Sequence, residues 1–188
     1  MMEALHTLGA HGRRALAELG YERPLRLERC PPANRRHFLG VNDIRVAVLR
    51  NAARDGVRLN FFFASWELQE RNWPYVMVPD AVAEVECAGT AVAALFEYDR
   101  ATEGLAYVVE RKLTRYAEGL DGFAFSRVIT VVDHARRREE LQRRTAEKLG
   151  DPRFCFLLRD ALADWSVREL LAAEGSGERS GVRTVLRP

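Results

Sequence analysis

Three acidic side chains fall at short spacing in an apolar stretch near the middle of the chain. Asp80 follows Pro79, and Glu97 and Asp99 lie two residues apart in a second apolar segment. Because side chains alternate along a strand, Glu97 and Asp99 project to the same side, and Asp80 can reach that side if a strand over Val76–Val85 pairs beside it. Three carboxylates at one spot require a cation or a proton to neutralise them.

The residue types in this stretch indicate the chemistry of phosphate esters. Hard divalent cations such as Mg²⁺ are held in proteins by one or two carboxylates together with water and phosphate oxygens of the substrate. A group of acids on a sheet therefore favours a metal-dependent site that acts on phosphodiesters. The alternative interpretation is that the acids stand at strand ends and turns and face solvent, as such acids commonly do.

The composition indicates one domain of ordinary size. The chain has 188 residues, of which 47% are hydrophobic, enough for a substantial core. Its three cysteines are odd in number and widely spaced, so they predict neither a zinc site nor a disulfide framework. The sequence shows no secretory signal pattern and no apolar run of membrane-spanning length. We expect a soluble, cytoplasmic protein without a membrane partner.

Basic residues are unevenly distributed. The formal net charge is only +2, so the total charge does not indicate nucleic acid binding. Arginines are nevertheless concentrated before residue 59 and again in the run Arg136-Arg137-Arg138, while Lys112 and Lys148 are the two lysines of the whole chain. Guanidinium groups suit phosphate contacts. A solvated surface of mixed charge is the alternative.

Hydrophobic periodicity and turn residues divide the chain into the elements that must position the acids. We expect a helix over 1–20, an extended connector over 21–36, a helix capped by Asn42 and ending before Gly56, a strand over 57–64, two strands within 76–103 separated by the turn 87–90, a helix over 104–118, a strand over 123–132, a helix over 134–149, a strand over 153–158, a short helical turn over 160–165, and a flexible tail over 173–188.

Single residues add detail to these elements. Pro79 within its expected strand predicts an edge strand or a bulge. Asp133 is expected to cap the helix over 134–149, which Gly150 ends. That helix should lie on the surface, because its apolar line is thin and consists of Ala135, Leu141, Ala146 and Leu149.

Lys112 and His37 are two further residues that could take part in chemistry. Lys112 falls near the centre of an apolar helix face, so it must extend to solvent or reach a carboxylate. His37 is interpreted as a structural hydrogen-bonding residue rather than a catalyst. The apolar face around Lys112 consists of Leu105, Val109, Leu113 and Tyr116.

The element order predicts an α/β fold with a mixed β-sheet flanked by helices and an αβββαβ core, because three consecutive strands allow antiparallel pairing and a helical crossover favours a parallel addition. This order resembles the core of the PD-(D/E)xK, restriction-endonuclease-like nucleases. The resemblance implies that Asp80 and Glu97 hold Mg²⁺, with Mn²⁺ as a substitute. Asp99 stands where that superfamily has a lysine, and Lys112 on the next helix is placed to supply one.

A narrower resemblance is to the replication-relaxation family of bacterial and plasmid proteins, over roughly residues 5–130. Members of this family typically begin with a winged helix-turn-helix module, of which we expect only the last helix, Leu5–Gly20. The implied domains are the tail of that module over 1–36, a nuclease-like domain over 37–172 and the tail over 173–188. The segments that carry the resemblance are His37–Asp43, Trp66-Glu67, Pro79–Ala81, Phe96–Glu103 and Lys112–Tyr116.

The resemblance leads to a first hypothesis, a DNA-binding protein on a nuclease-like scaffold that acts in plasmid or mobile-element replication or mobilisation. The absence of a lysine at Asp99 favours it, and a replication or mobilisation protein would be a natural partner. Phosphates would be contacted without base readout. The arginines expected to make these contacts are Arg35, Arg36, Arg100, Arg115, Arg136 and Arg137.

The alternative is an active Mg²⁺-dependent DNA endonuclease, for which a homodimer would suit symmetric cleavage. Asp80 and Glu97 would hold the metal, and Lys112 would orient the attacking water. Asp99 would be an extra ligand or a partner for Lys112, and Glu67 or Glu70 would add a carboxylate. The orientation of Lys112 distinguishes the nuclease from the binding protein, since a nuclease needs the lysine to point at the acids. A third alternative is a catalytically dead protein–protein interaction module, which an exposed patch at Trp73 or Trp165 would support.

Overall fold

The structure is a computed structural model that describes residues 35–71, 73, 75, 77–120 and 125–170. The chain divides into two units, Met1–Ala33 and Asn34–Pro188, and all described residues belong to the second. The predicted helix over 1–20, the connector up to residue 34 and the tail over 173–188 lie outside the described residues. Within the described ranges, no helix combines the length and the apolar character that a bilayer span requires.

The predicted helices and strands that the structure describes follow one another in the predicted order, and the structure adds a short helix over Ser65–Glu70 and a 3₁₀ turn over Val167–Leu170, which were not predicted. The strands are β1 (Arg58–Ala64), β2 (Ala81–Cys87), β3 (Thr90–Asp99), β4 (Phe125–Val132) and β5 (Phe154–Leu158). The helical elements are α2 (Arg35–Arg54), α3 (Ser65–Glu70), the π-helix η2 (Tyr107–Leu113), α4 (Thr114–Leu120), α5 (Ala135–Leu149) and the 3₁₀ turns η3 (Arg159–Ala163) and η4 (Val167–Leu170).

The five strands form one mixed sheet in the order β1-β2-β3-β4-β5. β1 pairs antiparallel with β2 and β2 with β3, whereas β3 pairs parallel with β4 and β4 with β5. Ala88 and Gly89 join β2 to β3, both with positive φ of 50° and 86°, as the tightest hairpin turns require. The predicted α/β class, the mixed sheet and the turn are confirmed.

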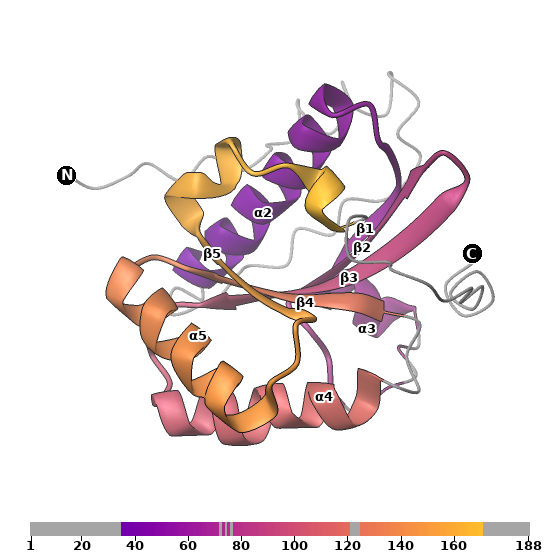
Figure 1. Ribbon diagram of the computed structural model, residues 1–188. Helices are drawn as coiled ribbons and strands as arrows, with labels where there is room; N and C mark the ends of the chain where they lie inside the picture. The colour runs from indigo at the N-terminus through magenta and orange to yellow at the C-terminus, as the bar shows by residue number, and fades with distance from the viewer. Residues whose placement is uncertain (1–34, 72, 74, 76, 121–124, 171–188) are drawn as a thin grey trace. The chain divides into compact units, whose positions relative to one another are not determined.

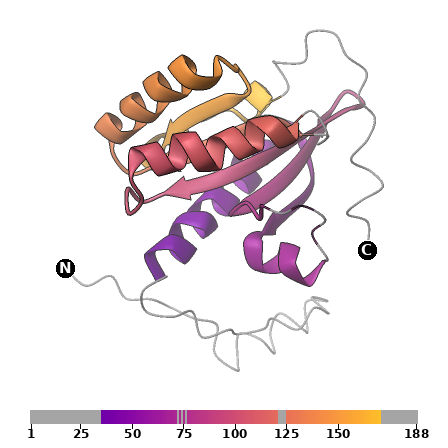
Figure 2. The same ribbon diagram turned by 90° about the horizontal axis from the view of Figure 1, so that it is seen from below.

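Helices cover both faces of this sheet, as Figures 1 and 2 show. α2 and the turns η3 and η4 pack on one face, where Ile44, Phe96 and Val167 belong to one core cluster. η2, α4 and α5 pack on the other, where Leu95 and Leu113 belong to a second cluster. Successive residues of β3 therefore contact different helices. Glu97 and Asp99 lie on the face of the sheet that η2, α4 and α5 cover.

The helix before β1 begins earlier than the sequence predicts. α2 includes Arg35 and Arg36, which we expected in the connector. Asn42 lies inside the helix and donates from Nδ2 to the Phe38 carbonyl (3.0 Å), so it is not the N-cap. The prediction was wrong because an asparagine side chain can bond to the backbone within a helix as well as at its start. Gly56 follows the helix with a φ of 64°, as predicted.

Two further predictions at element ends were wrong. Pro79 precedes β2, which begins at Ala81 and lies between β1 and β3, so the proline marks neither an edge strand nor a bulge. Asp133 does not cap α5, whose N-cap is His134 without a side-chain cap bond. The Asp133 carboxylate instead accepts a hydrogen bond from the Tyr98 hydroxyl (2.8 Å), a contact set by tertiary packing.

α5 is a surface helix, as expected, but its buried line differs from the predicted one. Leu141 and Thr145 are buried, whereas Ala135 and Ala146 are exposed. The helix ends where predicted, at Gly150. This glycine has a left-handed φ of 60°. Its N–H donates to the Ala146 carbonyl in the last turn of the helix (3.0 Å).

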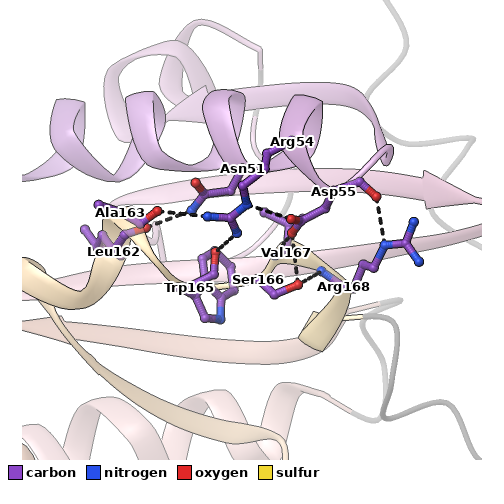
Figure 3. A network of polar contacts seen from close by, with 9 residues as sticks. All are labelled: Asn51, Arg54, Asp55, Leu162, Ala163, Trp165, Ser166, Val167 and Arg168. Atoms are coloured by element: carbon purple, nitrogen blue, oxygen red, sulfur yellow. Dashed lines mark hydrogen bonds and ion pairs between the residues drawn. The ribbon is translucent and has the colours of Figure 1, made fainter.

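A polar network fastens the C-terminal turns to the end of α2 (Figure 3). Asn51 donates from Nδ2 to the Leu162 carbonyl (2.7 Å). Arg54 donates from its two terminal nitrogens to the carbonyls of Ala163 (3.0 Å) and Trp165 (2.8 Å). Because backbone carbonyls of a non-repetitive segment have no ladder partner, side-chain donors from the neighbouring helix satisfy them.

Asp55 continues this network at the end of α2. Its Oδ2 accepts from the Ser166 hydroxyl (2.9 Å) and the Val167 amide (2.8 Å), and its Oδ1 accepts from Arg54 Nε (2.8 Å). The hydrogen bond from Arg54 is the largest influence on the carboxyl group and, with the two others, lowers the pKa of Asp55 to about 2. Arg168 donates to the Asp55 carbonyl (2.8 Å). The end of α2 and the segment over 166–168 thus each supply donors or acceptors to the other.

The two tryptophans considered for a partner-binding patch are engaged within the fold. Trp165 is only 7% exposed and meets Phe96 edge-on, with ring centroids 6.4 Å apart. Trp73 is partly buried and donates from Nε1 to the Met77 carbonyl (2.7 Å). These contacts give no support to an exposed tryptophan patch.

Candidate functional site

A cavity of about 290 Å³ lies at the sheet edge where β2 begins and β3 and β4 end. Asp80, Glu97, Asp99 and Glu103 line it together with Lys112. The carboxyl ends of the parallel strands meet at this edge, and the antiparallel strand β2 starts there. The structure thus brings Lys112 and three of the predicted acids, Asp80, Glu97 and Asp99, to the lining of one cavity.

Asp80 is held by two different elements. Its Oδ2 accepts from the Tyr98 amide of β3 (2.7 Å), and its Oδ1 lies 2.9 Å from His37 Nε2 of α2. Burial by itself would raise the pKa of Asp80, but the hydrogen bond from His37, the Lys112 charge and the Tyr98 amide together lower it below its usual range. Asp80 is therefore a fixed carboxylate.

Glu97 is buried, with 3% of its surface exposed. Its Oε2 lies 2.5 Å from Lys112 Nζ, and its Oε1 accepts from the Tyr116 hydroxyl. Burial and the neighbouring charge of Asp80 raise the pKa of Glu97 to about 8, although Lys112 and Tyr116 act in the opposite direction. The two acids at this site thus have pKa values displaced in opposite directions, a pattern common at functional sites.

Lys112 reaches the acids, which was one of its two expected placements. Burial lowers the pKa of its ammonium group, but the carboxylates of Glu97 and Asp80 outweigh burial and raise it. The ammonium therefore stays charged at neutral pH. Its catalytic role remains a prediction, but its orientation is the one that role requires.

A π-helix presents Lys112 to the cavity. Residues 107–113 form this segment, and the flanking residues Ala106 and Thr114 have α-helical angles, so it is inserted in an α-helix. The Thr114 hydroxyl donates to the Val109 carbonyl five residues earlier (3.0 Å). The prediction of one regular helix over 104–118 was wrong in this respect. Such insertions widen the turn and occur frequently at functional sites.

Asp99 does not join the other two acids. Its Oδ2 accepts from Arg137 Nε (2.7 Å), and its Oδ1 accepts from the Ala101 amide (2.8 Å). Over the described ranges, no group of three or more His, Cys, Asp or Glu side chains is arranged to hold a metal ion. The expected three-carboxylate cluster is wrong, because alternation fixes the face of a strand side chain but not its partner.

Arg137 was expected to contact nucleic acid, and the structure places it elsewhere. Its side chain is only 12% exposed, and besides Asp99 it donates to the Glu103 carbonyl (2.9 Å). Arg137 thus braces the loop between β3 and η2, which forms one wall of the cavity. A largely buried guanidinium that already donates to Asp99 and Glu103 is not available to a phosphate.

Glu67 lies away from the cavity. Its Oε2 accepts from the Ala64 amide (2.8 Å) at the start of α3, and its Oε1 accepts from Arg45 (3.2 Å). An acid in the first turn that bonds back to the preceding amide is a common helix-start arrangement. The expectation that Glu67 adds a carboxylate to the site is wrong.

The other predicted phosphate-binding arginines divide into two groups. Arg100 lines the cavity. Arg35, Arg36, Arg115 and Arg136 are exposed. Their contacts with nucleic acid remain predictions.

Tyr116 and Thr130 are site residues that the sequence interpretation missed. Tyr116 follows Lys112 by four residues, so the shared helix face was the available signal. Thr130 lies beside Glu97 in the parallel register of β3 and β4 and lines the cavity. No signal in the sequence identifies Thr130, because the register of two strands separated by a helix is a property of the folded sheet.

Two comparisons with known proteins complete these observations. The model of the family described as Replication-relaxation matches residues 2–132, which confirms the narrower resemblance. A comparison with curated proteins gives no match.

Proposed function

Because the chain belongs to the replication-relaxation family, we propose that it acts on DNA in the replication or mobilisation of a plasmid or another mobile element. We further propose that the cavity at Asp80 and Glu97 is a Mg²⁺-dependent DNA-cleaving site on a restriction-endonuclease-like, PD-(D/E)xK scaffold. The contact of Lys112 with Glu97 carries this proposal, since a binding protein could use the lysine for packing alone.

The arrangement of strands supports the scaffold. Asp80 immediately precedes β2, and Glu97 lies near the end of the adjacent strand β3. The helix that follows β3 then returns over the sheet and supplies Lys112. The positive charge that the superfamily places two residues after the second acid thus comes from the next element, and Asp99 is free to bind Arg137.

The cavity residues fit a hard divalent cation. Asp80 and Glu97 supply two carboxylates, and an oxygen that accepts one hydrogen bond keeps a second lone pair for a ligand. The charge of Asp80 contributes to the raised pKa of Glu97, and a bound cation relieves this repulsion. When bound, Mg²⁺ or its substitute Mn²⁺ would polarise a phosphate and lower the pKa of a bound water.

The side chains of the site have separate tasks in this proposal. His37 and the Tyr98 amide fix the Asp80 carboxylate, and Tyr116 fixes that of Glu97. The Lys112 ammonium would stabilise negative charge that develops on the phosphate. Because Lys112 is largely buried, its attraction for that negative charge is stronger than it would be in water.

The test combines metal titration with plasmid cleavage. Mg²⁺ and Mn²⁺ are titrated calorimetrically into wild type, Asp80→Asn, Glu97→Gln and Lys112→Met, and the same samples are incubated with supercoiled plasmid. We expect the two acid variants to lose metal binding and nicking, and Lys112→Met to lose nicking. Glu139→Gln, an exposed acid on α5, is the control. A wild type that binds neither metal would refute the proposal.

A second candidate is a DNA-binding protein without catalysis. The observation that favours it is that a protein group already contacts each oxygen of Asp80 and Glu97, and that the Lys112 ammonium offsets one of the two negative charges. The exposed arginines would then bind phosphates. Duplex binding without nicking, at the same affinity in Lys112→Met, would select this candidate. The winged-helix origin of residues 1–36 remains a prediction.

A further inference from the structure

Thr130 carries a buried hydroxyl without a partner in the wall of the candidate site. The residue is 1% exposed, and its Oγ1 has no hydrogen-bond partner among the described residues. It also lines the cavity that contains Asp80, Glu97 and Lys112. Buried hydroxyls are nearly always hydrogen-bonded, and an exception calls for an explanation.

The register of the sheet fixes where this hydroxyl lies. Thr130 is the parallel partner of Glu97, so both side chains stand on the same face. Its neighbours on that face of β4, Val128 and Val132, belong to the core cluster below η2 and α4. A valine would continue this pattern, so packing does not account for a hydroxyl at position 130.

Glu97, the neighbour of Thr130 across the two strands, does not accept a hydrogen bond from this hydroxyl. Its Oε1 accepts from Tyr116, and its Oε2 lies 2.5 Å from Lys112 Nζ. Thr145 of α5 has an equally buried, unpartnered hydroxyl, but it does not line this cavity. What distinguishes Thr130 is therefore its position beside a space that a ligand can enter.

We propose that the Thr130 hydroxyl binds an oxygen atom of the ligand that occupies this cavity. This inference rests on the proposed function, which makes that oxygen either a water carried by the metal ion or a phosphate oxygen of DNA. Both accept a hydrogen bond from a hydroxyl, and the two sources are separated by experiment. Thr130 is thus a ligand-contacting residue on the side of Glu97 opposite Asp80.

The variants Thr130→Val and Thr130→Ser separate the hydroxyl from the shape of the side chain. Valine keeps the volume and removes the hydroxyl, whereas serine keeps the hydroxyl. Thr145→Val is the matched control, because it removes an unpartnered hydroxyl that does not line the cavity. Thermal unfolding without ligand comes first. We expect both valine variants to be at least as stable as wild type, since each loses an unsatisfied polar group.

Two ligands are then titrated separately. Mn²⁺ alone reports on metal-bound water, and a fluorescein-labelled 30-base-pair duplex in EDTA reports on phosphate. We expect Thr130→Val to weaken one of the two affinities about tenfold, the worth of one hydrogen bond, while Thr130→Ser and Thr145→Val stay within about twofold of wild type.

The outcomes decide between the proposals. If wild type binds a ligand and Thr130→Val binds both ligands equally well, this inference is overturned and the proposed site stands. If Thr130→Val is clearly less stable than wild type, the hydroxyl is structural and the inference is likewise overturned. If wild type binds neither ligand, both proposals fall together.

Discussion

The ring of Tyr98 occupies the space in which a side chain at Gly40 would stand. A Cβ at this position of α2 would overlap three atoms of the ring. The ring cannot swing aside easily, because its hydroxyl donates to Asp133 (2.8 Å) and its backbone amide donates to Asp80 (2.7 Å). This close approach sets the distance of α2 from β3, and with it the reach of His37 to Asp80.

Replacing Gly40 by alanine should push α2 away from the sheet. We expect the free energy of unfolding to fall by about 1–3 kcal/mol, the usual cost of overpacking, and metal affinity to fall as His37 leaves Asp80. Urea denaturation and calorimetric titration measure the two effects. Gly104→Ala is the control, since no atom lies within 4 Å of its added Cβ. Equal stability of Gly40→Ala and wild type would contradict the packing described.

Glu97 should make the stability of the metal-free protein depend on pH. Its pKa is raised from 4.5 to about 8 in the folded state, so the folded protein keeps a proton that the unfolded chain releases. Its stabilising contribution is then complete below about pH 4.5 and is lost as the pH rises to about 8. Urea denaturation in EDTA should show this decline for wild type but not for Glu97→Gln. Parallel curves for the two proteins would refute it.

Asp55 should have the opposite pH dependence. Its pKa is lowered from 3.8 to about 2 by Arg54, Ser166 and Val167, so its contribution is present above about pH 4 and is lost as the pH falls through about 2. Asp55→Asn should be less stable than wild type at pH 6, and the difference should vanish near pH 2. Asp160→Asn, an exposed acid on η3, should match wild type throughout. Acid titration followed by circular dichroism measures all three proteins.

Arg136 and Arg137 are adjacent in sequence but should respond differently to substitution by glutamine. Arg137→Gln removes the contacts with Asp99 and the Glu103 carbonyl, and should lower the free energy of unfolding by about 1–3 kcal/mol. Arg136 is exposed, so Arg136→Gln should leave stability unchanged. If Arg136 contacts a phosphate, the slope of log affinity for DNA against log salt should fall by about 0.9. An unchanged slope would remove Arg136 from the DNA-binding surface.

Local patterns predicted most helices and strands of the fold and the two acids of the site, Asp80 and Glu97. The alternation around Glu97, the turn over 87–90 and the glycines after α2 and α5 depend on short-range geometry, and all were confirmed. Local reasoning left two placements for Lys112, since a lysine on an apolar helix face must find a carboxylate or solvent, and the structure shows the carboxylate.

Contacts between distant segments could not be predicted in the same way. Asp99 and Arg137 lie 38 residues apart, and their pairing depends on how α5 crosses β3. Asp133 is a residue type suited to caps, yet its carboxylate accepts from Tyr98, 35 residues away. The π-helix of η2 likewise has no sequence pattern separate from that of an α-helix.

The family match ends at Val132, the last residue of β4, but the folded unit continues. Beyond this point, Leu141 and Phe154 complete the core on one face of the sheet, and Leu162 and Val167 complete it on the other. A fragment that stops at Val132 would leave β4 as an open edge, a template for aggregation. The stretch that the family model matches is therefore shorter than the stretch that folds together, and the expressed domain should extend at least through Leu170.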